Sequence, residues 1–143
     1  MGPMQKRGAS QYGKVAVGSE TSFASPHRLI QMLMEGALDK IAFAKGQIGR
    51  KDLAEKGRNI TWAISIIQGL SASLDVESGG EIAANLEGLY GYMVRCLLEA
   101  NKNNDVAKLD EVASLLKEVK SAWDAMPSEV KQVTPEKAAS SVG

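Results

Sequence analysis

A long apolar stripe in the second half of the chain constrains its fold more than any other feature. Apolar residues recur there in alternating steps of four and three, at Ile82, Leu86, Leu89, Met93, Cys96 and Ala100. Residues at this spacing lie on one face of an α-helix. The pattern therefore predicts a helix over about residues 80–101, with the stripe turned toward a core.

The expected start of this helix is a glycine turn. Ser78 and Glu81 have the S-x-x-E spacing of a capping box, in which each side chain accepts from the other residue's backbone N–H. Gly79 and Gly80 lie between them and can adopt positive φ, so the chain reverses there without strain. Asp105 follows the stripe and offers an N-cap to the next helix.

Three more stretches carry a helical period and recognisable ends. Ser25 before Pro26 predicts a helix start, because serine caps well and proline at the first position loses no hydrogen bond. Asp52 can cap the following helix, and Pro127 blocks continuation of the last one. We expect helices over about residues 26–48, 52–74, 80–101 and 105–126.

Four helices of similar length with short connections predict an all-α fold, an antiparallel up-down-up-down four-helix bundle. The bundle is expected over residues 25–127. Residues 1–24 are rich in glycine and predict an extended or partly ordered N-terminal arm, and the polar residues 128–143 predict a disordered tail.

Composition excludes several classes of protein. The chain has 143 residues, and its 17 basic and 17 acidic side chains cancel, so bulk charge indicates no nucleic-acid partner. A single cysteine, Cys96, rules out a disulfide framework and indicates a reducing compartment. No apolar run reaches the ~20 residues that cross a bilayer, and no leader is recognisable. We expect a cytoplasmic protein without membrane insertion.

The chain lacks the side chains of a catalytic or metal centre. A di-iron bundle needs paired Glu-x-x-His motifs, and one histidine with one cysteine cannot supply a zinc site. We expect no enzyme, no catalytic residue, no cofactor and no metal. Phosphotransfer through His27 stays open as an alternative, because histidine phosphotransfer modules are also four-helix bundles; its place beside Pro26 disfavours it.

The helices expected over 52–74 and 80–101 carry more apolar surface than one core stripe needs, since Trp62 and Ile66 fall outside the stripe. The arm around Tyr12 or a neighbouring helix could cover the surplus, or a second copy could pair with it. An exposed groove for a partner helix is the functional interpretation. Its predicted residues are Tyr12, Trp62, Ile66, Tyr90 and Tyr92. Ile66→Asp should then weaken binding and leave the bundle folded.

Three stretches of the chain also form longer motifs. They are Ser25-Pro26-His27-Arg28-Leu29-Ile30 with Glu35-Gly36-Ala37; Gly69-Leu70 through Leu74-Asp75; and Gly79-Gly80-Glu81-Ile82-Ala83 with Asn85-Leu86, Leu89-Tyr90, Tyr92-Met93 and Ala100-Asn101. Asn104-Asp105, Glu111-Val112 and Trp123 extend them. On these residues the chain resembles the flagellar export chaperone family, FliS, over about residues 11–127.

This resemblance implies a four-helix bundle that binds the C-terminal segment of flagellin, which is disordered when free and wraps the bundle. Covering that segment would prevent premature polymerisation and aid delivery to the flagellar type III export apparatus. An export-gate component or other flagellar regulators are implied as further partners, and the chain would be a monomer or weak homodimer. Tyr12 matches the tyrosine of an N-terminal segment that rests on the bundle. Met34 departs from the family, which often has an aromatic there, but a thioether still fills a core or groove.

Overall fold

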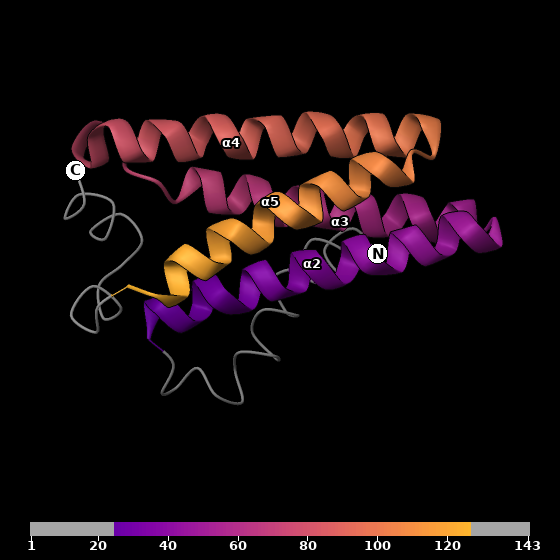
Figure 1. Ribbon diagram of the computed structural model, residues 1–143, viewed down its shortest axis with the longest axis horizontal. Coiled ribbons are helices and arrows are strands. Elements are labelled where there is room, and N and C mark those ends of the chain that lie inside the picture. The colour runs from indigo at the N-terminus through magenta and orange to yellow at the C-terminus, as the bar shows by residue number, and fades with distance from the viewer. Residues whose placement is uncertain (1–24, 127–143) are drawn as a thin grey trace, which may run out of the picture.

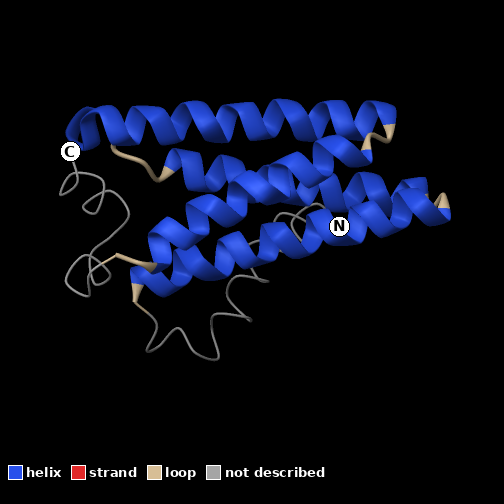
Figure 2. Cartoon of the chain, in the orientation of Figure 1, coloured by secondary structure: helices blue, strands red, loops and turns tan. Residues whose placement is uncertain are grey.

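The computed structural model describes residues 25–126, and four α-helices fill most of this range (Figure 1). They are α2 (Pro26–Arg50), α3 (Leu53–Ala72), α4 (Val76–Asn103) and α5 (Val106–Asp124). Figure 2 shows short loops between them and no strand within the described residues. The all-α prediction is confirmed; the expected arm and tail lie outside the described residues.

The helices form a ring in chain order. α2 packs against α3 and α5, and α4 packs against the same two helices. The connections are only residues 51–52, 73–75 and 104–105, so each helix runs antiparallel to the one before it. α5 crosses obliquely, since it begins beside the end of α4 and ends beside the start of α2 (Figure 1). This is the predicted up-down-up-down bundle.

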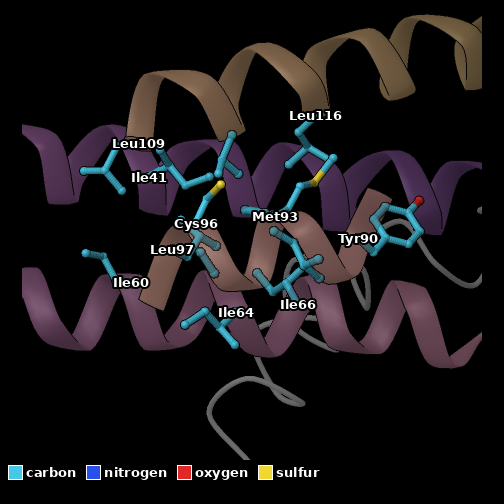
Figure 3. Packing of buried hydrophobic residues seen from close by; sticks show 14 of the residues in the cluster. Ile41, Ile60, Ile64, Ile66, Tyr90, Met93, Cys96, Leu97, Leu109 and Leu116 are labelled. Atoms are coloured by element: carbon cyan, nitrogen blue, oxygen red, sulfur yellow. The ribbon is translucent and has the colours of Figure 1, made fainter. Parts of the chain in front are cut away.

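All four helices contribute buried side chains to one core. The largest fully buried ones are Met34, Ile60, Ile67, Met93, Leu97, Leu109, Val112 and Leu116. Figure 3 shows several of them converging between the helices, together with Ile41 and Cys96. Full burial of one large aliphatic side chain stabilises a fold by about 1.5–3 kcal/mol. The middle of the bundle is therefore its most strongly held part.

Each helix begins at a residue whose side chain caps it. Ser25, Asp52, Asp75 and Asp105 each accept a hydrogen bond from the backbone N–H three residues later. Ser25, Asp52 and Asp105 are the predicted caps, and Pro26 occupies the first helical position as expected. These local signals are confirmed because a cap depends on only a few neighbouring residues.

The start of α4 differs from the predicted capping box at Ser78 and Glu81. Asp75 is the N-cap, and its carboxylate accepts from the Ser78 backbone N–H at 3.0 Å, which also holds the pKa of Asp75 below its ordinary value. The helix therefore starts one turn earlier than predicted. Gly80 then interrupts the helical backbone with φ 61° and ψ −140°, the positive φ expected of a glycine at this turn.

A buried lysine joins the start of α3 to the end of α4. The Lys56 Nζ donates to the Asn101 backbone oxygen at 2.8 Å and to the Asn104 side-chain oxygen at 2.7 Å. Asn104 is the C-cap of α4 and has a left-handed backbone. The ammonium thus lies at the negative end of the helix dipole, where carbonyls lack helical partners. No sequence pattern indicated this contact.

We predict that Lys56→Met lowers the free energy of unfolding by about 1.5–3 kcal/mol, because methionine fills the space but removes the charged donor from two acceptors at the end of α4. Urea denaturation followed by circular dichroism measures it. Lys45→Met is the control, since Lys45 is half-exposed and its pair with Asp110 at 2.9 Å should contribute at most about 1 kcal/mol. Equal losses in both variants would contradict the prediction.

Candidate functional site

The helices leave a partly open hollow of about 380 Å³ at one end of the bundle. This is the end where α2 and α4 begin and where α3 and α5 finish, as the antiparallel order requires. The residues that line it fall within positions 30–34, 70–74, 82–90 and 118–126. The hollow arises because α5 diverges from the start of α4 as it approaches the start of α2 (Figure 1).

The lining of the hollow is mostly apolar. Its polar groups are the side chains of Ser73 and Glu118, the Tyr90 hydroxyl and the Trp123 indole nitrogen. The indole Nε1 already has a hydrogen-bond acceptor within the bundle, since it donates to the His27 backbone oxygen at 2.9 Å. Burial raises the pKa of Tyr90 to about 12, so this side chain is neutral near pH 7. The volume falls within the range of about 300–1,000 Å³ typical of binding clefts, and the chemistry suits apolar side chains.

Two of the predicted binding residues come from the inner faces of α3 and α4. Tyr90 lines the hollow. Ile66 is only 8% exposed and belongs to the core (Figure 3), so the expectation that it lies on an exposed face is wrong. The physical reason is that α3 touches both α2 and α4 in the ring, and a helix with two neighbours buries a wider arc than one stripe.

Trp62 and Tyr92 lie on opposite sides of the ring. The Lys40 ammonium of α2 is 4.1 Å from the centroid of the Trp62 ring, which places Trp62 at the α2–α3 seam. The Tyr92 hydroxyl donates to the Glu111 carboxylate of α5, and this hydrogen bond raises the pKa of Tyr92. Because the α2–α3 and α4–α5 seams share no helix, one groove cannot hold all the predicted residues. Tyr12 lies outside the described residues.

Polar contacts join α2 to the end of α5 beside the hollow, and we name them the α2–α5 clasp. The Gln31 amide donates to the Asp124 carboxylate, and the Lys120 Nζ lies 2.9 Å from Asp124 and 3.7 Å from Glu35. The Lys120 ammonium lowers the pKa of Asp124, which raises the pKa of Lys120 in return. Both groups are thus charged near pH 7. Glu35 also pairs with Arg28 at 3.2 Å.

The residues considered for other chemistry are buried or scattered. His27, the candidate phosphoacceptor, is buried in the first turn of α2, and its ring stacks on Trp123 at a centroid distance of 4.8 Å. An imidazole in this position does not face a phosphodonor in solution. Within residues 25–126, no three metal-binding side chains gather, and no helix is long and apolar enough to span a membrane.

Comparison with protein families matches residues 8–130 to the family described as flagellar protein FliS. The chain belongs to the FliS family. The flagellar secretion chaperone FliSB of Pseudomonas aeruginosa is 53% identical over 114 residues, which are 80% of this chain and 90% of that protein. The flagellar secretion chaperone FliS of Vibrio cholerae is 42% identical over 129 residues, 90% of this chain and 95% of its own length.

A more distant member is also similar over more than two thirds of the chain. The flagellar secretion chaperone FliS of Bacillus subtilis is 36% identical over 100 residues, covering 70% of this chain and 74% of that protein. The family match includes every residue that lines the hollow. The resemblance read from the sequence motifs is therefore confirmed at the level of the family, and the hollow lies within the family's matched region.

Sequence reasoning missed the part of the hollow that α5 supplies. Val119, Trp123 and Met126 continue the stripe that begins at Leu109, so they were indistinguishable from core residues. In the structure they are partly exposed and line the hollow, whereas Leu109 is fully buried. The available signal was the position of Trp123 near the end of the stripe. A tryptophan side chain is rarely fully buried, which indicates a partly open site there.

We predict that Ile66→Asp lowers the free energy of unfolding by about 3 kcal/mol or more, because it places a carboxylate in the core. Thermal and urea unfolding monitored by helical circular dichroism measure the loss. Phe43→Asp is the control: Phe43 is 53% exposed on the neighbouring helix, so its replacement should cost less than about 1 kcal/mol. A stable Ile66→Asp variant would show that the side chain lies outside the core.

Proposed function

We propose that this chain is a cytoplasmic export chaperone that binds the C-terminal segment of flagellin and is not an enzyme. It would prevent premature polymerisation and aid delivery to the flagellar type III export apparatus. The names of the relatives, flagellar secretion chaperones, support the chaperone role. The observation that carries the proposal is the apolar hollow in a bundle of this family.

The chemistry of the hollow suits an amphipathic segment of a filament subunit. Such a segment buries apolar side chains in the filament, so it must cover them elsewhere before assembly. A hollow lined from all four helices can receive the apolar face of one helical turn or two. Ordering a disordered segment costs free energy, which lowers the net affinity and lets the client leave without nucleotide hydrolysis.

The remaining predicted contacts fit a client that wraps around the bundle. Trp62 and Tyr92 lie on opposite seams, and Tyr90 lies at the hollow between them. We assign these three to different parts of one extended client. Ile66 supports that surface from the core, and Tyr12 of the N-terminal arm would contribute to partner exchange. An export-gate component or other flagellar regulators would be further partners of a monomer or weak homodimer.

Two exposed aliphatic residues of α4 allow a matched test. Ile82 is 46% exposed and lines the hollow, whereas Leu98 is 55% exposed and does not line it. We predict that Ile82→Asp weakens binding of a flagellin C-terminal peptide by about tenfold or more, since it places a charge in an apolar contact. Leu98→Asp should leave the affinity nearly unchanged. Isothermal titration with a peptide from the same organism's flagellin measures both.

The same titration tests the client itself. Binding to the unchanged chain should be one-to-one with a large negative heat-capacity change, which reports apolar burial coupled to folding of the peptide. No heat and no complex in gel filtration would show that this flagellin segment is not the client. Equal weakening by both substitutions would show that the peptide binds elsewhere. Circular dichroism should show both variants folded, because both residues are exposed.

A further inference from the structure

The two parts of α5, residues 106–116 and 117–124, are held to the bundle differently. Leu109, Val112 and Leu116 are fully buried, and all three lie in the first part. Beyond Leu116, Val119 and Trp123 are only partly buried, and both line the hollow. Residues 106–116 of α5 are therefore fixed in the core, whereas residues 117–126 form one wall of the hollow.

The contacts that hold this wall against α2 are a partly exposed polar cluster and the stack of the Trp123 ring on the buried His27 ring. The clasp joins Lys120 and Asp124 to Glu35 and Gln31, and the charged side chains in it are 23–43% exposed. Ion pairs at such exposure contribute little net free energy, because water competes for both charges. The Trp123 indole adds one hydrogen bond to α2. Water can replace each of these polar contacts, and opening would also separate the Trp123 ring from the His27 ring.

The hollow is partly open, so the apolar side chains of an amphipathic helix can enter it from the opening. Movement of residues 117–126 would change its size, because Val119, Trp123 and Met126 belong to its lining.

We propose that residues 117–126 are a flap that separates from α2 by local opening of the last turns of α5, with the α2–α5 clasp holding it closed. Opening enlarges the hollow and admits the client, and reclosing covers the client's apolar side chains. Helix ends with few buried contacts are the segments that open most readily in folded proteins. The role in client loading rests on the proposed function, whereas the motion itself does not.

Hydrogen–deuterium exchange on the chain without client tests the motion. Backbone amides in residues 117–126 should exchange faster than those in 107–116. Lys120→Met removes the ion pairs of the clasp and should speed exchange in 117–126 by up to about fivefold, without changing 107–116. Lys45→Met is the control, since it removes an ion pair with Asp110 at the other end of the same seam. Uniform protection along α5, or equal effects of both variants, would overturn the proposal.

Reversible crosslinking tests the link to client loading. Gln31→Cys with Asp124→Cys, bridged by a reducible bismaleimide, would hold the flap closed. We expect this bridge to weaken binding of the flagellin C-terminal peptide by about tenfold or more and reduction to restore it. Lys45→Cys with Asp110→Cys bridges the same two helices away from the hollow and should leave the affinity unchanged. Intact mass verifies that the buried Cys96 stays unmodified.

The outcomes separate this proposal from the proposed function. If the bridged and the reduced forms of the Gln31–Asp124 variant bind the peptide equally well, the flap does not control loading and the proposal is wrong. If neither form binds and the unchanged chain does not bind either, the proposed client is wrong, and the exchange measurement still decides whether the flap opens. Equal loss of binding in both bridged pairs would show a general effect of stiffening and would also overturn the proposal.

Discussion

Burial of apolar side chains from four helices around one axis is the constraint on which the rest of the structure depends. Short connections make consecutive helices antiparallel, and each helix can bury its stripe only against two neighbours. Met93 and Leu109 are fully buried in the core that the four helices share. Toward the start of α2 the oblique path of α5 separates it from α4, and the same stripes line a hollow there.

The parts of the fold that depend on local sequence could be predicted. Ser25, Asp52 and Asp105 begin helices because a capping hydrogen bond spans only three residues. The predicted start of α4 was misplaced because Asp75 and Ser78 are competing caps, three residues apart. The earlier one, Asp75, already accepts from the Ser78 N–H. The Lys56 contact joins two helix ends far apart in sequence, so no local pattern could reveal it.

The site was less predictable because it depends on where each helix face lies within the ring. Ile66 and Trp62 both fall outside the main stripe of α3, yet Ile66 is buried and Trp62 lies at a seam. Periodicity shows that a residue is apolar and on a given face, but the neighbouring helices decide whether that face is covered. Of the four predicted residues that fall within 25–126, only Tyr90 lines the hollow.

The chemistry of the α2–α5 seam connects stability to the proposed function. An apolar seam at the end of α5 would gain free energy from burial and would keep the hollow closed against any client. The α2–α5 clasp of Gln31, Glu35, Lys120 and Asp124 gives directional contacts that water can replace at little cost, and the stack of Trp123 on His27 lies beside it. The bundle can therefore keep its fold through the buried residues of α5 up to Leu116 while residues 117–126 change position. Under the proposed function, the chaperone must both bind and release its client, which requires this division. A site that stayed closed could not take up the client, and a core that opened could not keep the bundle folded.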